Sequence, residues 1–427
     1  MNSVVKLFSP VQIGPITLSH RVVMAPLTRS RSEQPGDIPG GLMREYYTQR
    51  ASEGGLIISE ATSISTTAHG WFGAPGLYSD QQVEGWKKIT AAVHTKGGYI
   101  FSQLWHTGRA SHIEMRGGLQ PVTASVNSSY WEDGTQQVFT PGGWVTPSPH
   151  RAFEIEEIPG IIQDYRRSAE RAKAAGFDGV ELHAANGYLI DQFLQDGSNH
   201  RTDAYGGSIE NRSRLLFEVV EALVTVWGSD RVAVRIGPSG TFNGMSDGNP
   251  PALFDYVAGQ LNRFSLAYLH VIEPRIKGTV LVVEGQSPVA SERLRQVFEG
   301  KIIAAGGFEP NTAEAVVEKG DADLVAFGRY FISNPDLPKR IKLKLPLNSY
   351  DRSTFCTFDA RGYKDPAMSN VNTFSNPREP VARIVGASGI LRNNFDVFEP
   401  GDLVAAAKLQ YVPLSLDAIC PISTEVA

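Results

Sequence analysis

Short apolar runs recur through most of the chain, and their number and spacing constrain the fold more than any other feature. Each run has four to seven residues, which is typical of a strand that is buried on both faces. Segments with helical periodicity lie between several of the runs, at residues 80–94, 161–175, 209–227 and 311–319. The eight runs are residues 21–26, 55–60, 99–105, 180–183, 232–237, 268–272, 301–306 and 324–328.

This alternation of strand and helix predicts an α/β fold with a parallel sheet covered by helices. Eight strands over about 340 residues fit a (β/α)8 TIM barrel. A doubly wound sheet is the alternative. It is less favoured because no G-x-G-x-x-G segment follows the first run.

The expected helices carry signals at their ends. Asp80 and the pair Asn311-Thr312 are expected to cap two helices at their N-termini. Gly176 and Gly228 are expected to lie just beyond the C-termini of two others, because glycine adopts the left-handed conformation found there.

Two segments are added to the barrel pattern. Residues 11–18 alternate around a Gly-Pro turn, which predicts an N-terminal hairpin. About 50 residues separate Trp105, at the end of the third strand, from the next helix. This stretch contains Trp131 and Trp144, and it is expected to form a cap loop over the mouth of the barrel.

The end of the chain departs from the barrel pattern. We expect a barrel domain over residues 1–365 and a C-terminal extension over residues 366–427 that is rich in Asn, Ser and Pro near its start. The extension has too much apolar content for a disordered tail, so it is expected to pack on the barrel or at a subunit contact.

Charge and cysteine content exclude several classes of protein. The formal net charge is −5 and no long basic run occurs, which makes nucleic acid and anionic membranes improbable partners. The chain has two cysteines and no CxxC pair, which argues against structural zinc and iron–sulfur clusters. The first residues do not resemble a signal peptide, and no apolar run approaches the ~20 residues of a membrane span. We therefore expect a cytoplasmic protein, monomeric or homodimeric.

In a parallel barrel the active-site groups lie at the carboxyl ends of the strands. Here these ends carry amides, hydroxyls, two arginines and glycines rather than paired carboxylates, a Ser–His–Asp set or a metal cluster. Glycines at the last two strands suit a phosphate, and an arginine adds a bidentate partner. A flat ring with one phosphate, read by amides, describes FMN better than a dinucleotide.

The end of the fourth run carries His183, Asn186 and Tyr188. If one helical turn follows the strand, His183 and Asn186 lie on one face at i and i+3. Two donors would then converge beside a phenol, which suits polarisation of a carbonyl oxygen and delivery of a proton. A purely structural role, with the pair satisfying buried backbone groups, is the other reading.

The sequence resembles the Old Yellow Enzyme family of FMN-dependent ene-reductases, most closely its oxophytodienoate-reductase-like branch. The resemblance covers residues 5–365. It rests on segments 21–29, 103–106, 176–188, 234–238, 305–308 and 327–329 and on Asn211-Arg212.

The resemblance implies FMN as cofactor, NADPH (or NADH) as hydride donor, and an α,β-unsaturated carbonyl substrate reduced in a ping-pong reaction. His183 and Asn186 would hold the substrate oxygen and Tyr188 would protonate the α-carbon. The substrate pocket would include Trp105, Phe355 and Cys356, and Cys356 stands where the family commonly has tyrosine. The implied cofactor residues are Pro26, Leu27, Thr28, Ala61, Gln103, Arg235, Gly306, Gly307, Gly328 and Arg329.

Two alternatives remain open from the residues alone. One is a lyase on a phosphate-binding barrel, which would need a Schiff-base lysine or a metal cluster at strand ends. The other is a barrel scaffold whose C-terminal extension binds a partner.

Overall fold

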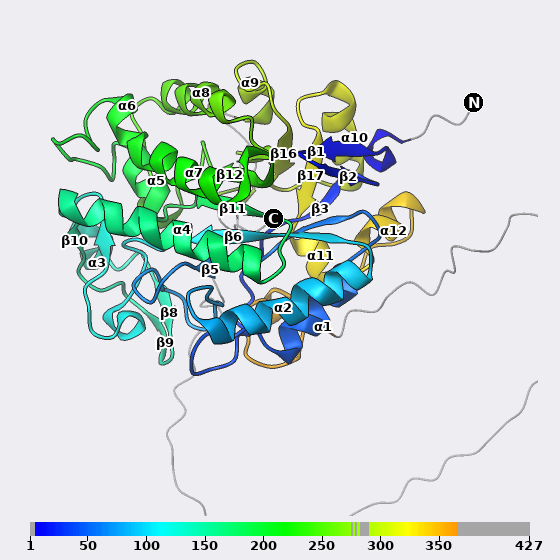
Figure 1. Cartoon of the computed structure of the whole chain (residues 1–427), viewed down its shortest axis with the longest axis horizontal. Coiled ribbons are helices and arrows are strands. Elements are labelled where there is room, and N and C mark those ends of the chain that lie inside the picture. Colours follow the sequence, from blue (N-terminus) through cyan, green and yellow to red (C-terminus); the bar gives the residue numbers. More distant parts are fainter. Residues whose placement is uncertain (1–4, 275, 278–279, 282–289, 365–427) are drawn as a thin grey trace, which may run out of the picture. The chain divides into compact units, whose positions relative to one another are not determined.

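The computed structural model describes residues 5–274, 276–277, 280–281 and 290–364 of the 427-residue chain. Eight parallel strands close into a barrel with helices on its outside (Figure 1), which confirms the predicted TIM barrel. The strands pair in chain order, and the last returns to the first through Ala326 and Val23. Each apolar run contains one strand. The barrel strands are β3 (Val22–Met24), β4 (Leu56–Ile58), β6 (Tyr99–Trp105), β11 (Gly179–Ala184), β12 (Val232–Ile236), β13 (Tyr268–Ile272), β16 (Ile302–Ala305) and β17 (Leu324–Phe327).

The predicted N-terminal hairpin closes one end of the barrel. Strands β1 (Val11–Ile13) and β2 (Ile16–Leu18) pair antiparallel. Their buried side chains join the cluster that fills the barrel interior, together with Phe101 and Tyr268 near the beginnings of their strands. Because the hairpin seals the end where the strands begin, the opposite end is left for a site.

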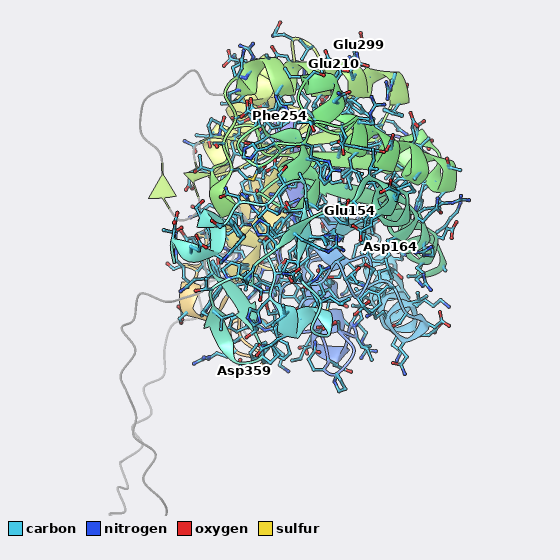
Figure 2. The ribbon with its side chains drawn as sticks, turned by 90° about the vertical axis from the view of Figure 1, so that its left-hand side faces the viewer. Glu154, Asp164, Glu210, Phe254, Glu299 and Asp359 are labelled. Carbon is cyan, nitrogen blue, oxygen red and sulfur yellow. The ribbon has the colours of Figure 1, made fainter. Side chains whose placement is uncertain are left out.

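The outer helices cover the strands through large buried side chains. Phe254 is one such residue, whereas Glu210 and Glu299 are exposed at the outer edge of the described part (Figure 2). These elements are α1 (Gly41–Arg50), α2 (Asp80–Thr95), α4 (Ile158–Ala174), α5 (Leu189–Leu194), α6 (Ile209–Arg212), α7 (Arg214–Trp227), α8 (Pro250–Leu261), α9 (Ser291–Leu294), α10 (Pro310–Lys319), α11 (Arg329–Ser333) and α12 (Leu337–Lys342).

The two predicted N-terminal caps are wrong by one to three residues. Helix α2 is capped by Ser79, whose hydroxyl accepts the Gln82 N–H while the Gln82 side chain accepts the Ser79 N–H, so Asp80 is already inside the helix. Helix α10 begins after Glu309, and the Thr312 hydroxyl accepts the Glu309 N–H from within the helix. In both cases a reciprocal capping box fixes the start, because it satisfies several free helix N–H groups together.

The C-terminal ends are closer to expectation. Gly228 is the C-cap of α7, and Gly176 follows the Ala175 C-cap of α4 with a left-handed φ of +80°. The continuous helix predicted over residues 209–227 is interrupted at Ser213, which separates α6 from α7.

The expected cap loop between β6 and α4 contains several short elements. It holds β7 (Val122–Thr123), α3 (Ser129–Glu132), the hairpin β8 (Val138–Thr140) and β9 (Gly143–Val145), and β10 (Arg151–Ala152). Trp144 lies edge-on against Trp71, with ring centroids 5.1 Å apart. Tyr130 donates to the side-chain oxygen of Asn243, 3.3 Å away, in the loop after β12. The cap loop therefore contacts the loops at the barrel mouth.

Three buried arginines near the beginning of the chain hold the last described segment. We call Arg29, Arg31 and Arg50 the arginine collar. Each donates to main-chain carbonyl oxygens of residues 354–363, at 2.8 to 3.4 Å. These acceptors satisfy guanidinium groups that would otherwise be costly to bury. The collar thus ties the segment after β3 to the chain beyond the last barrel strand.

The predicted extension over residues 366–427 lies outside the described residues, and the division of the chain at residue 365 stays a prediction. In the described part, no helix combines the length and the apolar character needed to cross a membrane.

Candidate active site

A pocket opens at the carboxyl ends of β3, β4, β6, β11 and β12. All of its lining residues except Phe242 were candidates from the sequence. The lining residues are Pro26, Thr28, Ala61, Gln103, Trp105, His183, Asn186, Tyr188, Arg235 and Phe242. The strand ends therefore bring side chains that are far apart in the sequence to one place, as the barrel topology requires.

Phe242 was missed because it lies beyond the strand it follows. Strand β12 ends at Ile236, and Phe242 begins a short 3-10 turn (Phe242–Gly244) in the next loop. An aromatic residue in a loop has no strand-end signal, and only the folded loop carries it back to the mouth of the barrel.

The segment from His183 to Tyr188 differs from the helical turn that we expected. His183 lies on β11, whereas Asn186 and Gly187 both have left-handed backbones, with φ of +59° and +65°. Helix α5 begins only after Tyr188, its N-cap residue. The tight turn still places the three side chains around one pocket. The Tyr188 ring is edge-on to His183, with ring centroids 5.1 Å apart, and to Trp105 at 4.9 Å.

His183 is a neutral imidazole at physiological pH. Burial and then the charge of Arg235 lower the pKa of His183 well below its usual value. Its Nδ1 is buried and has no hydrogen-bond partner among the described residues, and the same holds for Nε1 of Trp105. Because both residues line the pocket, these two nitrogens are available to a bound group.

A buried carboxylate orients Gln103. Its side-chain nitrogen donates to Glu181 Oε1 at 2.8 Å, and His270 Nδ1 lies 2.9 Å from Glu181 Oε2. Burial alone would raise the pKa of Glu181, but His270, Arg235 and Gln103 outweigh it and hold that pKa below its usual value. One N–H of the Gln103 amide is therefore bound to Glu181, which identifies the nitrogen and leaves the amide oxygen to accept from a ring N–H.

Sequence reasoning missed the role of Glu181, although it lies only two residues before His183. A single charged residue within an apolar run was the available signal. A charged residue that is fully buried needs partners, and Gln103 on the neighbouring strand is one of them.

A second cavity lies at the ends of β16 and β17, farther round the same rim. Its lining includes Gly307, Gly328, Arg329 and Tyr350. Arg329 lies over the Tyr350 ring, 5.4 Å from its centroid, and donates to the Tyr350 hydroxyl at 3.4 Å. Gly307 has a left-handed φ of +67°, which a side chain would disfavour. Backbone N–H groups beside one arginine suit a phosphate.

The remaining candidates lie close to these cavities without lining them. Leu27 and Gly306 are next to lining residues in the sequence. Phe355 is buried, and its ring lies 5.9 Å from the guanidinium carbon of Arg29. The sulfur of Cys356 lies 3.9 Å from the carbonyl oxygen of Thr28. Their roles in binding stay predictions.

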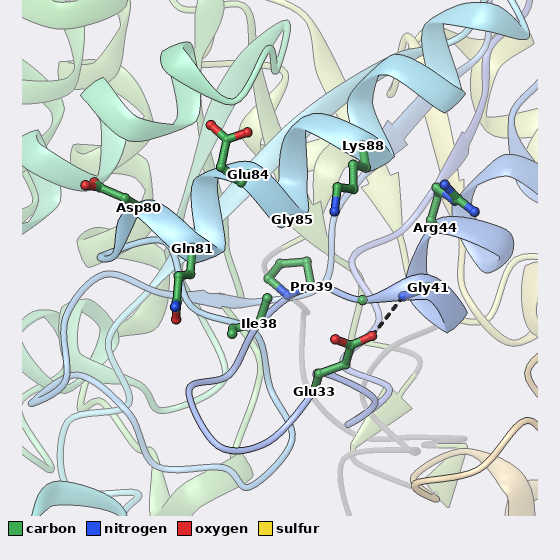
Figure 3. Close-up of a pocket in the computed structure, with 11 residues that line it drawn as sticks. Glu33, Ile38, Pro39, Gly41, Arg44, Asp80, Gln81, Glu84, Gly85 and Lys88 are labelled. Carbon is green, nitrogen blue, oxygen red and sulfur yellow. Dashed lines mark hydrogen bonds between the residues drawn. The ribbon is translucent and has the colours of Figure 1, made fainter.

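An open pocket on the outside of the barrel has a different character. It lies between the start of α1 and the first half of α2 and mixes acidic and basic side chains, including Glu84 and Lys88 (Figure 3). The Glu33 carboxylate accepts the Gly41 N–H at 3.1 Å and so serves the start of α1. None of the barrel strands contributes to its lining, so we place the chemistry at the mouth.

The donor set of the mouth fits FMN. Gln103 presents an amide to the edge of a flat ring, Arg235 places positive charge at the same pocket, and the second cavity suits one phosphate. The described residues contain no group of three or more His, Cys, Asp or Glu side chains that could hold a metal ion.

Comparison with known proteins agrees with this geometry. Residues 6–348 match the model of the NADH:flavin oxidoreductase / NADH oxidase family. The chain is 46% identical over 365 residues to 12-oxophytodienoate reductase 1 of Oryza sativa subsp. japonica, covering 84% of this chain and 92% of that protein. It is also 46% identical to 12-oxophytodienoate reductase 2 of Arabidopsis thaliana, over 84% of this chain and 95% of that protein.

Solved structures give the same result. Morphinone reductase in complex with tetrahydroNAD has a TM-score of 0.78 and 47% identity, over 85% of this chain and 98% of that chain. The Old Yellow Enzyme homologue from Zymomonas mobilis has a TM-score of 0.80 and 43% identity, over 84% of this chain and 99% of that chain.

A TIM barrel with this mouth and these relatives is an NAD(P)H-dependent flavin oxidoreductase of the ene-reductase type, and its family implies FMN. The chain belongs to the NADH:flavin oxidoreductase / NADH oxidase family, within its Old Yellow Enzyme group and similar to the oxophytodienoate reductases.

Proposed function

We propose that the protein reduces the C=C bond of α,β-unsaturated carbonyl compounds (enones and enals), and that of nitroalkenes, in two alternating half-reactions at one site. The observation that carries this proposal is the group of His183, Asn186 and Tyr188 facing one pocket with Gln103 and Arg235. FMN bound at the mouth would supply the redox chemistry, which is hydride transfer from NADPH or NADH to the substrate.

Residues of both cavities would hold the cofactor. Gln103 accepts from a ring N–H because its amide nitrogen is bound to Glu181. Arg235 would balance negative charge on the ring, and Thr28 lines the same pocket. Gly307 and Arg329 hold the phosphate, with Gly328 beside them.

His183 and Asn186 bind the substrate oxygen. A neutral imidazole donates one N–H, and the Asn186 amide donates a second. Negative charge grows on that oxygen as the β-carbon is reduced, so these donors stabilise the transition state more than the bound substrate. Because the pKa of His183 is far below 7, it polarises the oxygen without carrying a positive charge.

Tyr188 donates the proton that completes the reaction at the α-carbon. Its ring is held edge-on between His183 and Trp105, which fixes the direction of its hydroxyl. Tyr188 is buried and lines the same pocket as His183 and Asn186, so it is placed to give its proton directly to a substrate bound there.

Anaerobic stopped-flow spectroscopy tests the proposal. The purified protein, supplied with FMN, should be yellow, NADPH should bleach its absorbance near the flavin maximum, and an enone should restore it. NADH in a parallel series gives the cofactor preference. A folded protein that retains no flavin absorbance once unbound FMN has been removed, or a reduced protein that no enone, enal or nitroalkene reoxidises, would contradict the proposal.

The alternatives gain little support. A Schiff-base lyase needs a lysine in the pocket, and no lysine lines either cavity at the mouth among the described residues. Lys301 precedes β16 at the opposite end of the barrel and pairs with Asp323 at 3.2 Å. The scaffold reading depends on residues 366–427, which lie outside the described residues. The cytoplasmic location and the monomeric or homodimeric state stay predictions.

A further inference from the structure

The peptide groups of the turn after β11 are held by side chains outside the pocket. The carboxylate of Asp191 accepts the Gly187 N–H at 2.9 Å, and the amide of Gln192 donates to the Gly187 carbonyl oxygen at 2.6 Å. The Asn243 amide donates to the carbonyl oxygen of Asn186 at 2.9 Å. Asp191 and Gln192, which are consecutive residues of α5, therefore bond to the main-chain N–H and the carbonyl oxygen of Gly187.

This turn needs external support. Asn186 has a left-handed φ of +59°, a conformation that few residues with a side chain adopt and that asparagine tolerates better than most. The turn also lies close against its neighbours, because a Cβ on Gly187 would come within 2.6 Å of Asn243 Cβ and of the Phe242 carbonyl oxygen. A strained segment persists only where the surrounding structure determines it.

Gln192 uses all of its hydrogen-bonding capacity at this place. Its oxygen accepts from the Arg109 N–H at 3.1 Å and from the Thr123 hydroxyl at 2.8 Å. Its nitrogen donates to the Thr107 carbonyl at 3.1 Å as well as to Gly187. Thr107, Arg109 and Thr123 all belong to the loop between β6 and α4, so one buried amide joins the cap loop to the turn.

We propose that Asp191 and Gln192 are positioning residues for Asn186 and Tyr188. They hold Gly187, the residue between Asn186 and Tyr188, in place. Because Gln192 also bonds to the cap loop, the position of Gly187 depends on that loop. This inference rests on the proposed roles of Asn186 and Tyr188, but the hold on Gly187 can be measured without any catalysis.

Amide hydrogen exchange at Gly187 in the FMN-loaded enzyme is the direct test. Asp191→Leu removes the acceptor and should speed exchange at Gly187 by at least about tenfold. Asp191→Asn keeps one acceptor oxygen for the Gly187 N–H but loses the acceptor that the Gln195 amide uses at 2.7 Å, so it should speed exchange less than Asp191→Leu. Gln192→Leu and Gln192→Glu should also speed exchange, because neither side chain can donate to the two carbonyl oxygens.

Gln82→Leu is the matched control. Gln82 is an equally buried amide that serves the start of α2, where it accepts from the Tyr78 and Ser79 N–H groups and donates to Gly36. This variant should lose thermal stability to a similar extent while leaving exchange at Gly187 unchanged. Equal exchange in Gln82→Leu and Gln192→Leu would reduce Gln192 to a general structural role and overturn the proposal.

Ligand binding gives a second readout. Phenols that stack on an oxidised flavin produce a charge-transfer band, which reports the site without turnover. Gln192→Leu should weaken phenol binding by about tenfold and slow reoxidation by an enone more than reduction by NADPH. Unchanged exchange and unchanged phenol affinity would refute the proposal. Failure of the wild-type enzyme to react with either NADPH or NADH would instead refute the proposed function and leave the exchange result standing.

Discussion

At the scale of single residues, Glu60 is notable because it is fully buried beside the pocket-lining Ala61. Its carboxyl oxygens accept from the Tyr47 hydroxyl at 3.2 Å and from the main-chain N–H of Arg29 at 3.3 Å. Burial nevertheless dominates and raises the pKa of Glu60 to about 7. Between its unfolded pKa of about 4.5 and this value, the folded protein holds a proton that the unfolded chain has lost.

Glu60 therefore makes the protein less stable as pH rises from about 4.5 to 7. We predict that Glu60→Gln removes this dependence and makes the slope of unfolding free energy against pH less negative by up to about 1.4 kcal/mol per pH unit in that window. Urea unfolding of wild type and Glu60→Gln at pH 5, 6 and 7 measures this slope. Parallel slopes in the two proteins would show that Glu60 does not titrate there.

The phenol of Tyr188 gives a prediction about chemistry. Tyr188→Phe keeps the ring that packs between His183 and Trp105 but removes the proton donor. Reoxidation of the reduced enzyme by an enone should slow by about 10²-fold or more, and reduction by NADPH should stay nearly unchanged. Single-turnover measurements of each half-reaction separate the two. An equal loss in both would contradict the role of Tyr188 as proton donor.

At the scale of elements, the sequence predicted the strands best. Buried parallel strands require continuous apolar runs, so a short stretch of sequence is enough to locate each strand, as in the run that forms β6. The N-terminal caps of α2 and α10 were misplaced because the reciprocal bonds of Ser79 with Gln82 and of Glu309 with Thr312 decide the start. The presence of one residue type that favours N-caps does not show which position forms these reciprocal bonds.

The difference between local signals and contacts made only in the fold also explains which site residues could be predicted. Residues at strand ends could be predicted because the barrel topology fixes where strand ends meet. Phe242, Glu181 and Gln192 could not, because their contribution depends on loop paths and on contacts across 69 to 89 residues of sequence, as for the bonds of Gln192 with Thr123 and of Glu181 with His270. The left-handed turn at Asn186 also depends on such contacts.

Gly187 allows a prediction about this turn. Gly187→Ala should destabilise the protein by about 2 kcal/mol or more, because a left-handed backbone and contacts as close as 2.6 Å both oppose a Cβ. Gly117→Ala is the matched control, since Gly117 has a φ of +63° but no atom within 4 Å of the added Cβ. Denaturant unfolding of both variants isolates the packing contribution. Equal losses would mean that the backbone conformation alone matters.

At the scale of the whole molecule, both cavities should contribute to the stability of the loaded enzyme. A ligand that binds only the folded state stabilises it by about 2.7 kcal/mol at 100 times its Kd. We predict that removing FMN lowers the melting temperature and that riboflavin, which lacks the phosphate, restores less of it than FMN does.

Arg329→Leu should narrow the difference between FMN and riboflavin because Arg329 lines the second cavity. Arg352→Leu is the control: its guanidinium lies 6.0 Å from the centroid of the Tyr350 ring that Arg329 also covers, yet it does not line that cavity. Thermal scans with each flavin compare the variants. If FMN and riboflavin still differed in melting temperature by the wild-type amount in Arg329→Leu, the phosphate would have to bind somewhere other than the second cavity.

The arginine collar has a consequence for how the protein is made. Its guanidinium groups are 313 to 333 residues away from their carbonyl acceptors in residues 354–363. At about 5–20 residues per second of translation, that is a wait of roughly 15 to 65 s on the ribosome. During this time Arg29, Arg31 and Arg50 stay hydrated, so the packing around β3 cannot be completed. A nascent chain released before residue 354 would expose these cations beside unfinished apolar strands and become a substrate for chaperones and proteases.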